Sequence, residues 1–122
     1  MISTKGRYAL RVLIDLAEQG STTYVPLKEI AKRQGISEKY LQQIVKILVG
    51  KGLLPGISGK GGGYRLTASP EEYNVGEILE LMEGSLTPVA CLAPDTNTCS
   101  RSSHCKTLPM WKKFDNLVHD YF

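Results

Sequence analysis

The segment 55–63 constrains the fold more than any other part of this chain, because five of its nine residues are glycine. Glycine permits tight turns and positive φ, but it loses more conformational entropy on folding than any other residue. Short strand candidates, residues 53–54 and 64–66, flank the segment. We therefore predict a β-hairpin with a glycine-rich tip. The run 61–63 costs entropy and brings no packing benefit, which favours a binding role for the tip.

Two helices are expected near the start of the chain. The first has Ser3 or Thr4 as its cap, repeats apolar residues on one face and ends near Gly20. The second follows Pro26 and breaks at Gly35. Its apolar residues face inward, and its cations are predicted to face outward: Lys28, Lys32 and Arg33.

A third helix, starting after Ser37, is the best marked in the sequence. Ser37 is a favourable N-cap residue, and Ile36 and Leu41 stand at the two positions of a hydrophobic staple. The helix ends around Gly50 or Gly52, with apolar residues on one face and polar residues on the other. Two helices joined by a turn and followed by a hairpin describe a winged helix-turn-helix.

The C-terminal half adds a helix, a loop and a final helix. A capping box at residues 69–72 begins a helical turn, and Asn74 caps a helix that stops at Gly84. Residues 85–106 show little periodicity and are expected to form a loop. A last helix runs from about Thr107 to the end of the sequence, with one apolar stripe: Trp111, Phe114, Leu117, Val118 and Tyr121.

The predicted architecture is therefore mainly α with a small β-hairpin. We assign residues 1–84 to a winged helix-turn-helix domain, 85–106 to a cysteine-containing loop and 107–122 to a long dimerisation helix. A domain this small has little surface left to cover the stripe of a terminal helix. We therefore expect the stripe to bury against a second copy of the chain in a homodimer.

Charge is unevenly distributed along the chain. The net charge is only +3, but residues 1–65 carry eleven Lys and Arg against four Asp and Glu, whereas residues 66–122 carry four against eight. A basic front half predicts a polyanionic partner for that half alone. No segment has the apolar length of a membrane span, and the N-terminus has no apolar signal region. We therefore expect a cytoplasmic protein.

The third helix and the hairpin are predicted to contact double-stranded DNA. Gln42 or Gln43 can form a bidentate pair with adenine, and Lys39 can donate to guanine. Phosphates attract cations and backbone N–H groups, so the other lysines and the hairpin tip are expected along the DNA backbone. The complete predicted interface is Thr4, Lys5, Tyr8, Lys28, Ser37, Glu38, Lys39, Tyr40, Gln42, Gln43, Lys46, Ser58, Lys60, Gly61 and Gly62.

Other classes of function stay open on these patterns. A winged helix can bind a protein partner instead of DNA, and a small zinc or electron-transfer protein would take up metal without binding DNA. Catalysis is the least supported class, because no Ser/His/Asp or Cys/His set stands out and no small-molecule substrate site is indicated.

All three cysteines, Cys91, Cys99 and Cys105, fall within 15 residues. An odd number of thiols cannot pair completely within one chain, and the spacing is wider than the C-x2-C of common zinc sites. Three thiolates from one loop can hold an iron–sulfur cluster, with the fourth position open or taken by another ligand. A thiol- or zinc-based redox switch and inert thiols remain alternatives, and spacing alone does not identify the metal.

Together, these motifs resemble the Rrf2 family of bacterial transcription regulators. The resemblance lies in residues 3–9, 30–31, 35–43 and 59–64, and in the three-cysteine loop ahead of Trp111. It implies a repressor that dimerises through the C-terminal helix and binds near-palindromic operators. It also implies a 2Fe–2S or 4Fe–4S cluster on Cys91, Cys99 and Cys105 that senses iron–sulfur status, redox state or nitric oxide, and we favour 2Fe–2S.

Several positions depart from the family pattern. Leu108 stands where the iron–sulfur regulators have a histidine ligand, and Arg7 stands where the nitric-oxide sensors supply an aspartate ligand from the partner subunit. The fourth ligand is therefore unidentified. Gln42 stands where the iron–sulfur regulators commonly have glutamate, which would alter operator preference. The branch of the family that represses cysteine metabolism lacks the cysteine trio, which argues against that branch.

Overall fold

The computed structural model describes residues 1–20, 22–57, 61–94 and 99–122. Within these residues the chain forms five α-helices, a two-stranded hairpin and three short 3-10 turns. No helix within these ranges has both the length and the hydrophobicity to cross a membrane. The elements are α1 (Thr4–Gln19), α2 (Leu27–Gln34), α3 (Glu38–Gly50), β1 (Gly56–Ile57), β2 (Gly63–Tyr64), η1 (Pro70–Glu72), α4 (Val75–Glu83), η2 (Ala90–Leu92), η3 (Ser102–His104) and α5 (Leu108–Tyr121), where η marks a 3-10 turn.

The helices begin and end at the capping residues that the sequence marks. The side chains of Ser3, Ser37 and Asn74 accept hydrogen bonds from backbone N–H groups of α1, α3 and α4 at 3.2, 3.3 and 2.9 Å. Ser3, and not Thr4, is thus the cap of α1. Gly35 ends α2 in the left-handed region, with a φ of 64°. The predicted mainly α class with a small hairpin is confirmed.

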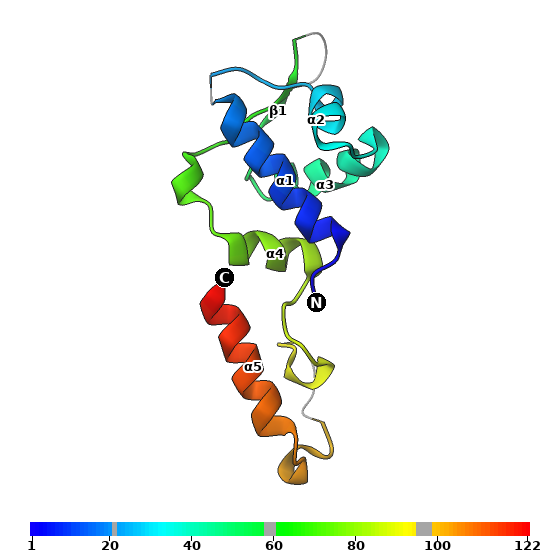
Figure 1. The fold of residues 1–122 in the computed structure, drawn as a ribbon, viewed down its shortest axis with the longest axis vertical. Helices are drawn as coiled ribbons and strands as arrows, with labels where there is room; N and C mark the ends of the chain where they lie inside the picture. The colour runs from blue at the N-terminus through cyan, green and yellow to red at the C-terminus, as the bar shows by residue number, and fades with distance from the viewer. Residues whose placement is uncertain (21, 58–60, 95–98) are drawn as a thin grey trace.

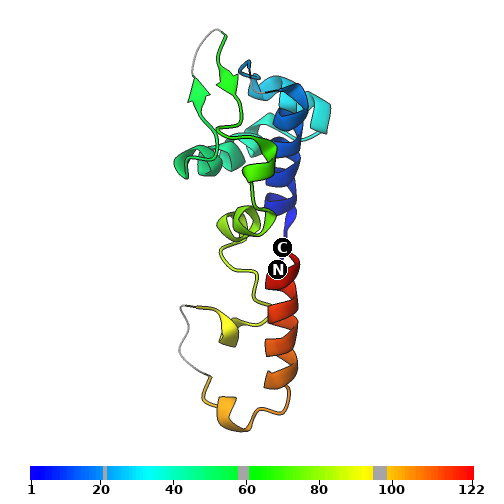
Figure 2. The same ribbon diagram turned by 90° about the vertical axis from the view of Figure 1, so that its left-hand side faces the viewer.

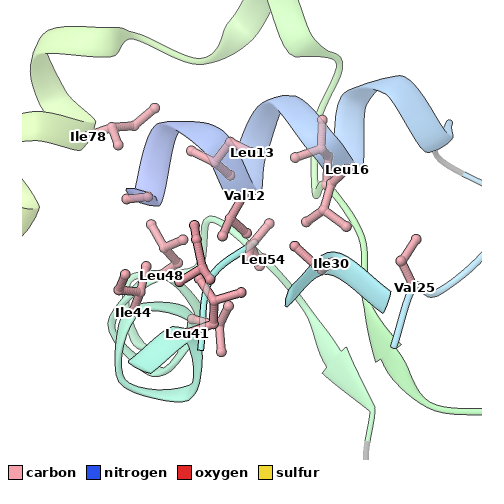
Figure 3. Close-up of a cluster of buried hydrophobic side chains, with 14 of the residues drawn as sticks. Val12, Leu13, Leu16, Val25, Ile30, Leu41, Ile44, Leu48, Leu54 and Ile78 are labelled. Carbon is pink, nitrogen blue, oxygen red and sulfur yellow. The ribbon is translucent and has the colours of Figure 1, made fainter. Parts of the chain in front are cut away.

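The hydrophobic core lies between α1 and the helix pair α2–α3. Figure 3 shows Val12 and Leu16 of α1 pointing toward Ile30 of α2 and Leu41 and Leu48 of α3, and each of the five is at most 1% exposed. Burying one side chain of this size contributes about 1.5–3 kcal/mol. Because the apolar face of α3 is held inward, its opposite, polar face is held outward.

An ion pair between a buried carboxylate and a partly exposed guanidinium joins α1 to α2. Asp15 is 2% exposed and accepts hydrogen bonds from Arg33 Nε at 3.0 Å and Arg33 Nη2 at 2.8 Å. Gln34 Nε2 donates to the same carboxylate at 2.9 Å, and Arg11 donates to Gln34 in turn. Arg33 was predicted to be an outward-facing cation, and its side chain is exposed, as predicted. Its guanidinium also satisfies the buried carboxylate of Asp15, a contact that the sequence analysis did not predict.

The hairpin is present, but its strands differ from the prediction. Residues 53–54 were expected to form a strand, whereas β1 begins at Gly56 and Leu54 is a core residue that is 1% exposed. Tyr64 of β2 also pairs with Val25, ahead of α2, through two backbone hydrogen bonds of 2.8 and 2.9 Å. This long-range pair attaches the base of the hairpin to the helical core.

Gly63 has a packing role that the sequence analysis did not foresee. Its φ is 148°, and a Cβ atom at this position would collide with the backbone of Val25 and Pro26. The close approach allows the pairing between β2 and Val25. The argument that the glycine run brings no packing benefit is therefore wrong at Gly63.

α5 lies outside the helical core (Figure 1), and its C-terminal end packs against α4. In both Figure 1 and Figure 2 the hairpin lies at one end of the molecule and the segment between α4 and α5 lies at the other. Val118 and Phe122 pack on Leu79 of α4 and on Leu86 beyond it. Phe122 also abuts Gly76, where a Cβ atom would lie 3.2 Å from the backbone of Phe122. A small apolar contact thus joins α5 to the core.

Candidate functional sites

The outer face of α3 gathers the polar residues that were predicted to contact DNA. Glu38, Lys39, Gln42, Gln43 and Lys46 are all exposed. Hydrogen-bond donors and acceptors on one exposed helix face have the arrangement needed to read base edges in a major groove.

The start of α1 adjoins the start of α3. The rings of Tyr8 and Tyr40 meet edge to face with centroids 5.7 Å apart, and Thr4 Oγ1 lies 3.5 Å from the Tyr40 hydroxyl. Ser37 is exposed, but its Oγ is already engaged in capping α3. The structure therefore brings together predicted interface residues from both helices. Lys5 is half-buried on α1.

A groove of about 340 Å³ separates α3 from the hairpin. Gln42 and Lys46 line one side, and Ile57 and Tyr64 line the other. Val49, also in the wall, is 37% exposed, and Ile57 is 51% exposed. Val49 and Ile57 were not identified from the sequence. The available signal was that each is an apolar residue in an otherwise polar surface.

The hairpin tip is described only in part. Ser58 and Lys60 lie outside the described residues. Gly61 is exposed with a φ of 79°, which suits a turn at the tip. Gly62 is buried, which argues against the direct DNA contact predicted for it. Lys28, the remaining predicted contact, is exposed on the first turn of α2.

The three cysteines line a single pocket of about 340 Å³ between the 85–106 segment and the start of α5. Cys91 and Cys99 are exposed, Cys105 is half-buried, and all three are free thiols. The other wall residues are Leu92, Ser102, Ser103, Leu108 and Lys112. Leu108 is thus in the pocket, at the position where the resemblance places a histidine ligand.

The donor set of the pocket is thiol-rich. Neither histidine nor carboxylate stands among the lining residues that the structure describes, and residues 95–98 lie outside them. No three His, Cys, Asp or Glu side chains among the described residues stand close enough to hold one metal ion directly. The thiols therefore surround a shared space without converging on one point. His104, next to Cys105, bonds Ser103 Oγ through Nδ1 at 2.9 Å.

The thiol of Cys105 is polarised by its neighbours. Hydrogen bonding with Thr107, whose Oγ1 lies 3.4 Å from the sulfur, lowers the pKa of Cys105, and the positive charge of Arg101 adds to the effect. A lowered pKa increases the fraction of thiolate, which is the form that binds metals and reacts with oxidants.

An ion pair supplements the apolar contact between α5 and α4. His119 Nε2 lies 3.3 Å from Glu80 Oε1, and His119 Nδ1 lies 2.9 Å from the carbonyl oxygen of Asp115. Hydrogen bonding to the Asp115 carbonyl and the charges of Asp115, Glu80 and Asp120 raise the pKa of His119. The ion pair, unlike the apolar contact, therefore depends on the protonation of His119.

A helix-turn-helix with an exposed polar helix and a hairpin beside it defines a winged-helix DNA-binding regulator. The Rrf2 family model, described as an iron-dependent transcriptional regulator, matches residues 2–122. The chain therefore belongs to the Rrf2 family.

Three relatives illustrate the family. Protein rrf2 of Nitratidesulfovibrio vulgaris is 36% identical over 110 residues, which cover 90% of this chain and 73% of the relative. The structure of IscR from T. potens is 33% identical with a TM-score of 0.73, over 99% of this chain and 78% of that one. The structure of CymR, the global cysteine regulator of B. subtilis, is 31% identical with a TM-score of 0.71, over 100% and 98%.

These comparisons confirm a DNA-binding transcription regulator with a winged helix and confirm that the chain does not belong to a class of enzymes. They do not separate the branches of the family, because IscR and CymR are about equally similar to this chain. The presence of three cysteines argued against the cysteine-regulator branch, but overall similarity to IscR and CymR does not support that argument.

Proposed function

We propose that the chain is a homodimeric repressor whose DNA affinity is set by an iron–sulfur cluster on Cys91, Cys99 and Cys105. The observation that carries the proposal is the convergence of these three cysteines on one pocket beside α5. Thiolates are the usual protein ligands of iron–sulfur clusters. An iron–sulfur cluster takes its ligands at separate iron atoms, so thiols that surround a space without meeting at one point suit a cluster better than a single metal ion.

DNA is read by α3 and by the hairpin in this proposal. Gln42 and Gln43 contact base edges in the major groove, and Lys46, in the groove beside the hairpin, contacts a phosphate. Thr4 and the Tyr40 hydroxyl, which adjoin at 3.5 Å, donate to a phosphate on the other side of α3. Ser58 and Lys60 belong to the proposed interface on the basis of sequence alone.

Dimerisation uses the apolar stripe of α5 that stays exposed in the single chain. Its residues recur at i, i+4, i+7 and i+11 along the helix: Met110, Phe114, Leu117 and Tyr121, which are 42–81% exposed. Met110 was missed in the sequence. Val118 was predicted in the stripe but is buried against α4, and Trp111 is half-buried. The exposed stripe needs a partner, and its spacing suits a second copy of α5.

The cluster and the DNA are linked through α5. The start of α5 lines the thiol pocket with Leu108, and its end packs on α4 through Val118. Ligation draws the 85–106 segment toward the cluster and shifts α5, which sets the spacing of the two DNA-reading heads in a dimer. An allosteric coupling of this kind is typically worth about 1–3 kcal/mol, or about 5–150-fold in operator affinity.

The test combines metal analysis with DNA binding. The protein is purified anaerobically, and iron, acid-labile sulfide and visible absorption are measured for the wild type and for the Cys91→Ala, Cys99→Ala and Cys105→Ala variants. Affinity for DNA sites selected from a random pool is then measured with and without the cluster. The proposal requires iron with sulfide in the wild type, loss in each variant and a cluster-dependent affinity, and it fails if the wild type holds neither iron nor sulfide.

DNA binding has its own test, which does not depend on the cluster. Lys46→Ala is expected to weaken binding to all sequences and to reduce the slope of log affinity against log salt by about 1, because one phosphate contact is lost. Gln43→Ala is expected to relax base preference with little change in that slope. Lys113→Ala, an exposed lysine on α5, is the matched control and should leave both properties unchanged.

A thiol switch without a cluster is the second candidate. The lowered pKa of Cys105 favours it, because a thiolate at the pocket surface reacts readily with oxidants. A thiol switch predicts no iron or sulfide but an oxidant-dependent change in DNA affinity that the Cys105→Ala variant loses.

A further inference from the structure

We propose that Glu83 is a positioning residue for DNA binding: it fixes the first turn of α1, so that the Thr4 hydroxyl meets a phosphate beside Tyr40. Glu83 is the last residue of α4, and it acts on the DNA only through α1. This role rests on the proposed phosphate contact of Thr4 and Tyr40. It adds the group that holds that contact in place.

The carboxylate of Glu83 accepts several hydrogen bonds from the start of α1. Its Oε1 accepts from the backbone N–H of Ser3 at 2.8 Å, from Ser3 Oγ at 2.8 Å and from the backbone N–H of Gly6 at 3.0 Å. The first N–H groups of a helix have no partner within the helix. Glu83 satisfies two such donors, and its negative charge is favourable at the N-terminal end of a helix.

These bonds hold a segment that packing leaves loose. Residues 1–4 are all exposed, and an exposed segment at the start of a domain is usually poorly ordered unless other contacts tie it down. Ser3 and Gly6 stand on either side of Thr4, so bonds to both fix the position of Thr4. The Thr4 and Tyr40 hydroxyls lie 3.5 Å apart, and two hydroxyls so placed can donate to one phosphate.

α4 approaches α1 closely at this point because Gly6 has no side chain. Gly6 is buried, and a Cβ atom there would lie 2.5 Å from Glu83 Oε1 and 3.1 Å from the side chain of Leu79. Burial alone would raise the pKa of Glu83, but the hydrogen bonds from Ser3 and Gly6 outweigh it and lower that pKa. The carboxylate is therefore ionised at neutral pH, and hydrogen bonds to an ionised acceptor are stronger than those to a neutral one.

The sign of the effect on DNA affinity separates positioning from simple charge. A carboxylate near a phosphate repels the DNA, so by charge alone its removal should strengthen binding. Positioning predicts the opposite: Glu83→Ala should weaken binding about threefold to tenfold, the effect of losing about one hydrogen bond to the DNA. Glu77→Gln is the matched control, because it removes the same charge from an exposed position on α4. It should change the affinity by less than about twofold.

A double-mutant cycle shows whether Glu83 acts through Thr4. Affinities for DNA sites selected from a random pool are measured by fluorescence anisotropy for the full chain, with circular dichroism as the check on folding. Thr4→Val removes the hydroxyl, so Glu83→Ala should lose most of its effect in that background. In the Lys46→Ala background, on the other side of α3, its effect should be unchanged. A general loss of stability would weaken binding by the same factor in both backgrounds.

The outcomes distinguish this role from the proposed function. If the wild type binds no DNA, the proposed function fails. If Thr4→Val binds like the wild type, the proposed contact at Thr4 is wrong and the role of Glu83 falls with it. If Thr4→Val weakens binding but Glu83→Ala binds as tightly as the wild type or more tightly, only the role of Glu83 is overturned. Should Glu83→Ala fail to fold, Glu83→Gln takes its place in the cycle, with a smaller loss expected in the same direction.

Discussion

The ion pair between Asp15 and Arg33 predicts an unequal response to removal of its two partners. Asp15 is 2% exposed, whereas the side chain of Arg33 is 36% exposed. Replacing Arg33 with Met leaves a buried carboxylate with only the Gln34 hydrogen bond of 2.9 Å. Replacing Asp15 with Asn leaves a guanidinium that water can still solvate.

The magnitudes follow from this difference in burial. Breaking a buried pair costs about 3–5 kcal/mol when the remaining charge stays buried, so we expect Arg33→Met to lower the free energy of unfolding by about 3 kcal/mol. Asp15→Asn should cost about 1–2 kcal/mol, because a neutral hydrogen-bonding group remains. The double variant, Asp15→Leu with Arg33→Met, should cost less than Arg33→Met alone, since no buried charge is left. Lys32→Met, an exposed lysine on the same helix, is the control and should cost less than about 0.5 kcal/mol.

Urea denaturation followed by circular dichroism measures these free energies, and pH adds a second test. Hydrogen bonds from Arg33 and Gln34 outweigh the effect of burial and lower the pKa of Asp15. In the wild type, the stabilisation is therefore present above the unfolded pKa of an aspartate and lost as the pH falls through the lowered folded value. In Arg33→Met, burial without the guanidinium raises that pKa, so the deficit relative to wild type should shrink between about pH 7 and pH 4.5. If Arg33→Met costs no more than Asp15→Asn at pH 7, the reasoning from burial is refuted.

Three further predictions concern the remaining contacts. Gly6→Ala should lower the free energy of unfolding, measured by urea titration, by about 1–2 kcal/mol. The added Cβ atom would lie 2.5 Å from the Glu83 carboxylate, which accepts hydrogen bonds from the start of α1. A gain in stability would contradict this prediction. The pKa of His119 is raised in the folded protein, so its ion pair with α4 stabilises the fold fully below the unfolded pKa of histidine. This stabilisation is lost as the pH rises through the raised folded pKa, so the melting temperature should fall between about pH 6 and pH 8. The His119→Gln variant should lack that pH dependence. Leu117→Glu should convert a dimer to a monomer in analytical ultracentrifugation, whereas Asn116→Glu, the adjacent exposed control, should not, because only Leu117 lies in the apolar stripe.

Local signals in the sequence were enough to predict the helices. Caps such as Ser37 and Asn74, and breakers such as Gly35, act through bonds to neighbouring residues, so they can be identified without knowledge of the fold. The same is true of the clustering of the cysteines, because all three lie within 15 residues of one another in the sequence. The gathering of Cys91 and Cys105 in one pocket was expected for that reason.

The features that the sequence did not predict depend on long-range partners. Gly63 is required by the backbone of Val25, which lies 38 positions earlier, and only the folded chain brings them together. Arg33 has the pattern of an exposed helix cation, and nothing local indicates a buried carboxylate at Asp15. The sequence analysis placed Leu117 and Val118 in one apolar stripe of α5. They lie on two different faces, because adjacent residues are about 100° apart around a helix.

In the proposed mechanism, the different faces of α5 connect the thiol pocket with the DNA-reading helices of a dimer. Its start lines the thiol pocket, its end packs on α4 through Val118, and the exposed stripe from Met110 to Tyr121 runs along another face. A helix of 14 residues is about 20 Å long. In the proposed mechanism, movement at the pocket end would tilt the whole helix about its contact with α4. That contact is small, since only a few apolar residues and the His119 ion pair form it. A stiff helix on a small contact changes its angle at low cost, and in a dimer built on the stripe each such change would alter the distance between the two α3 helices.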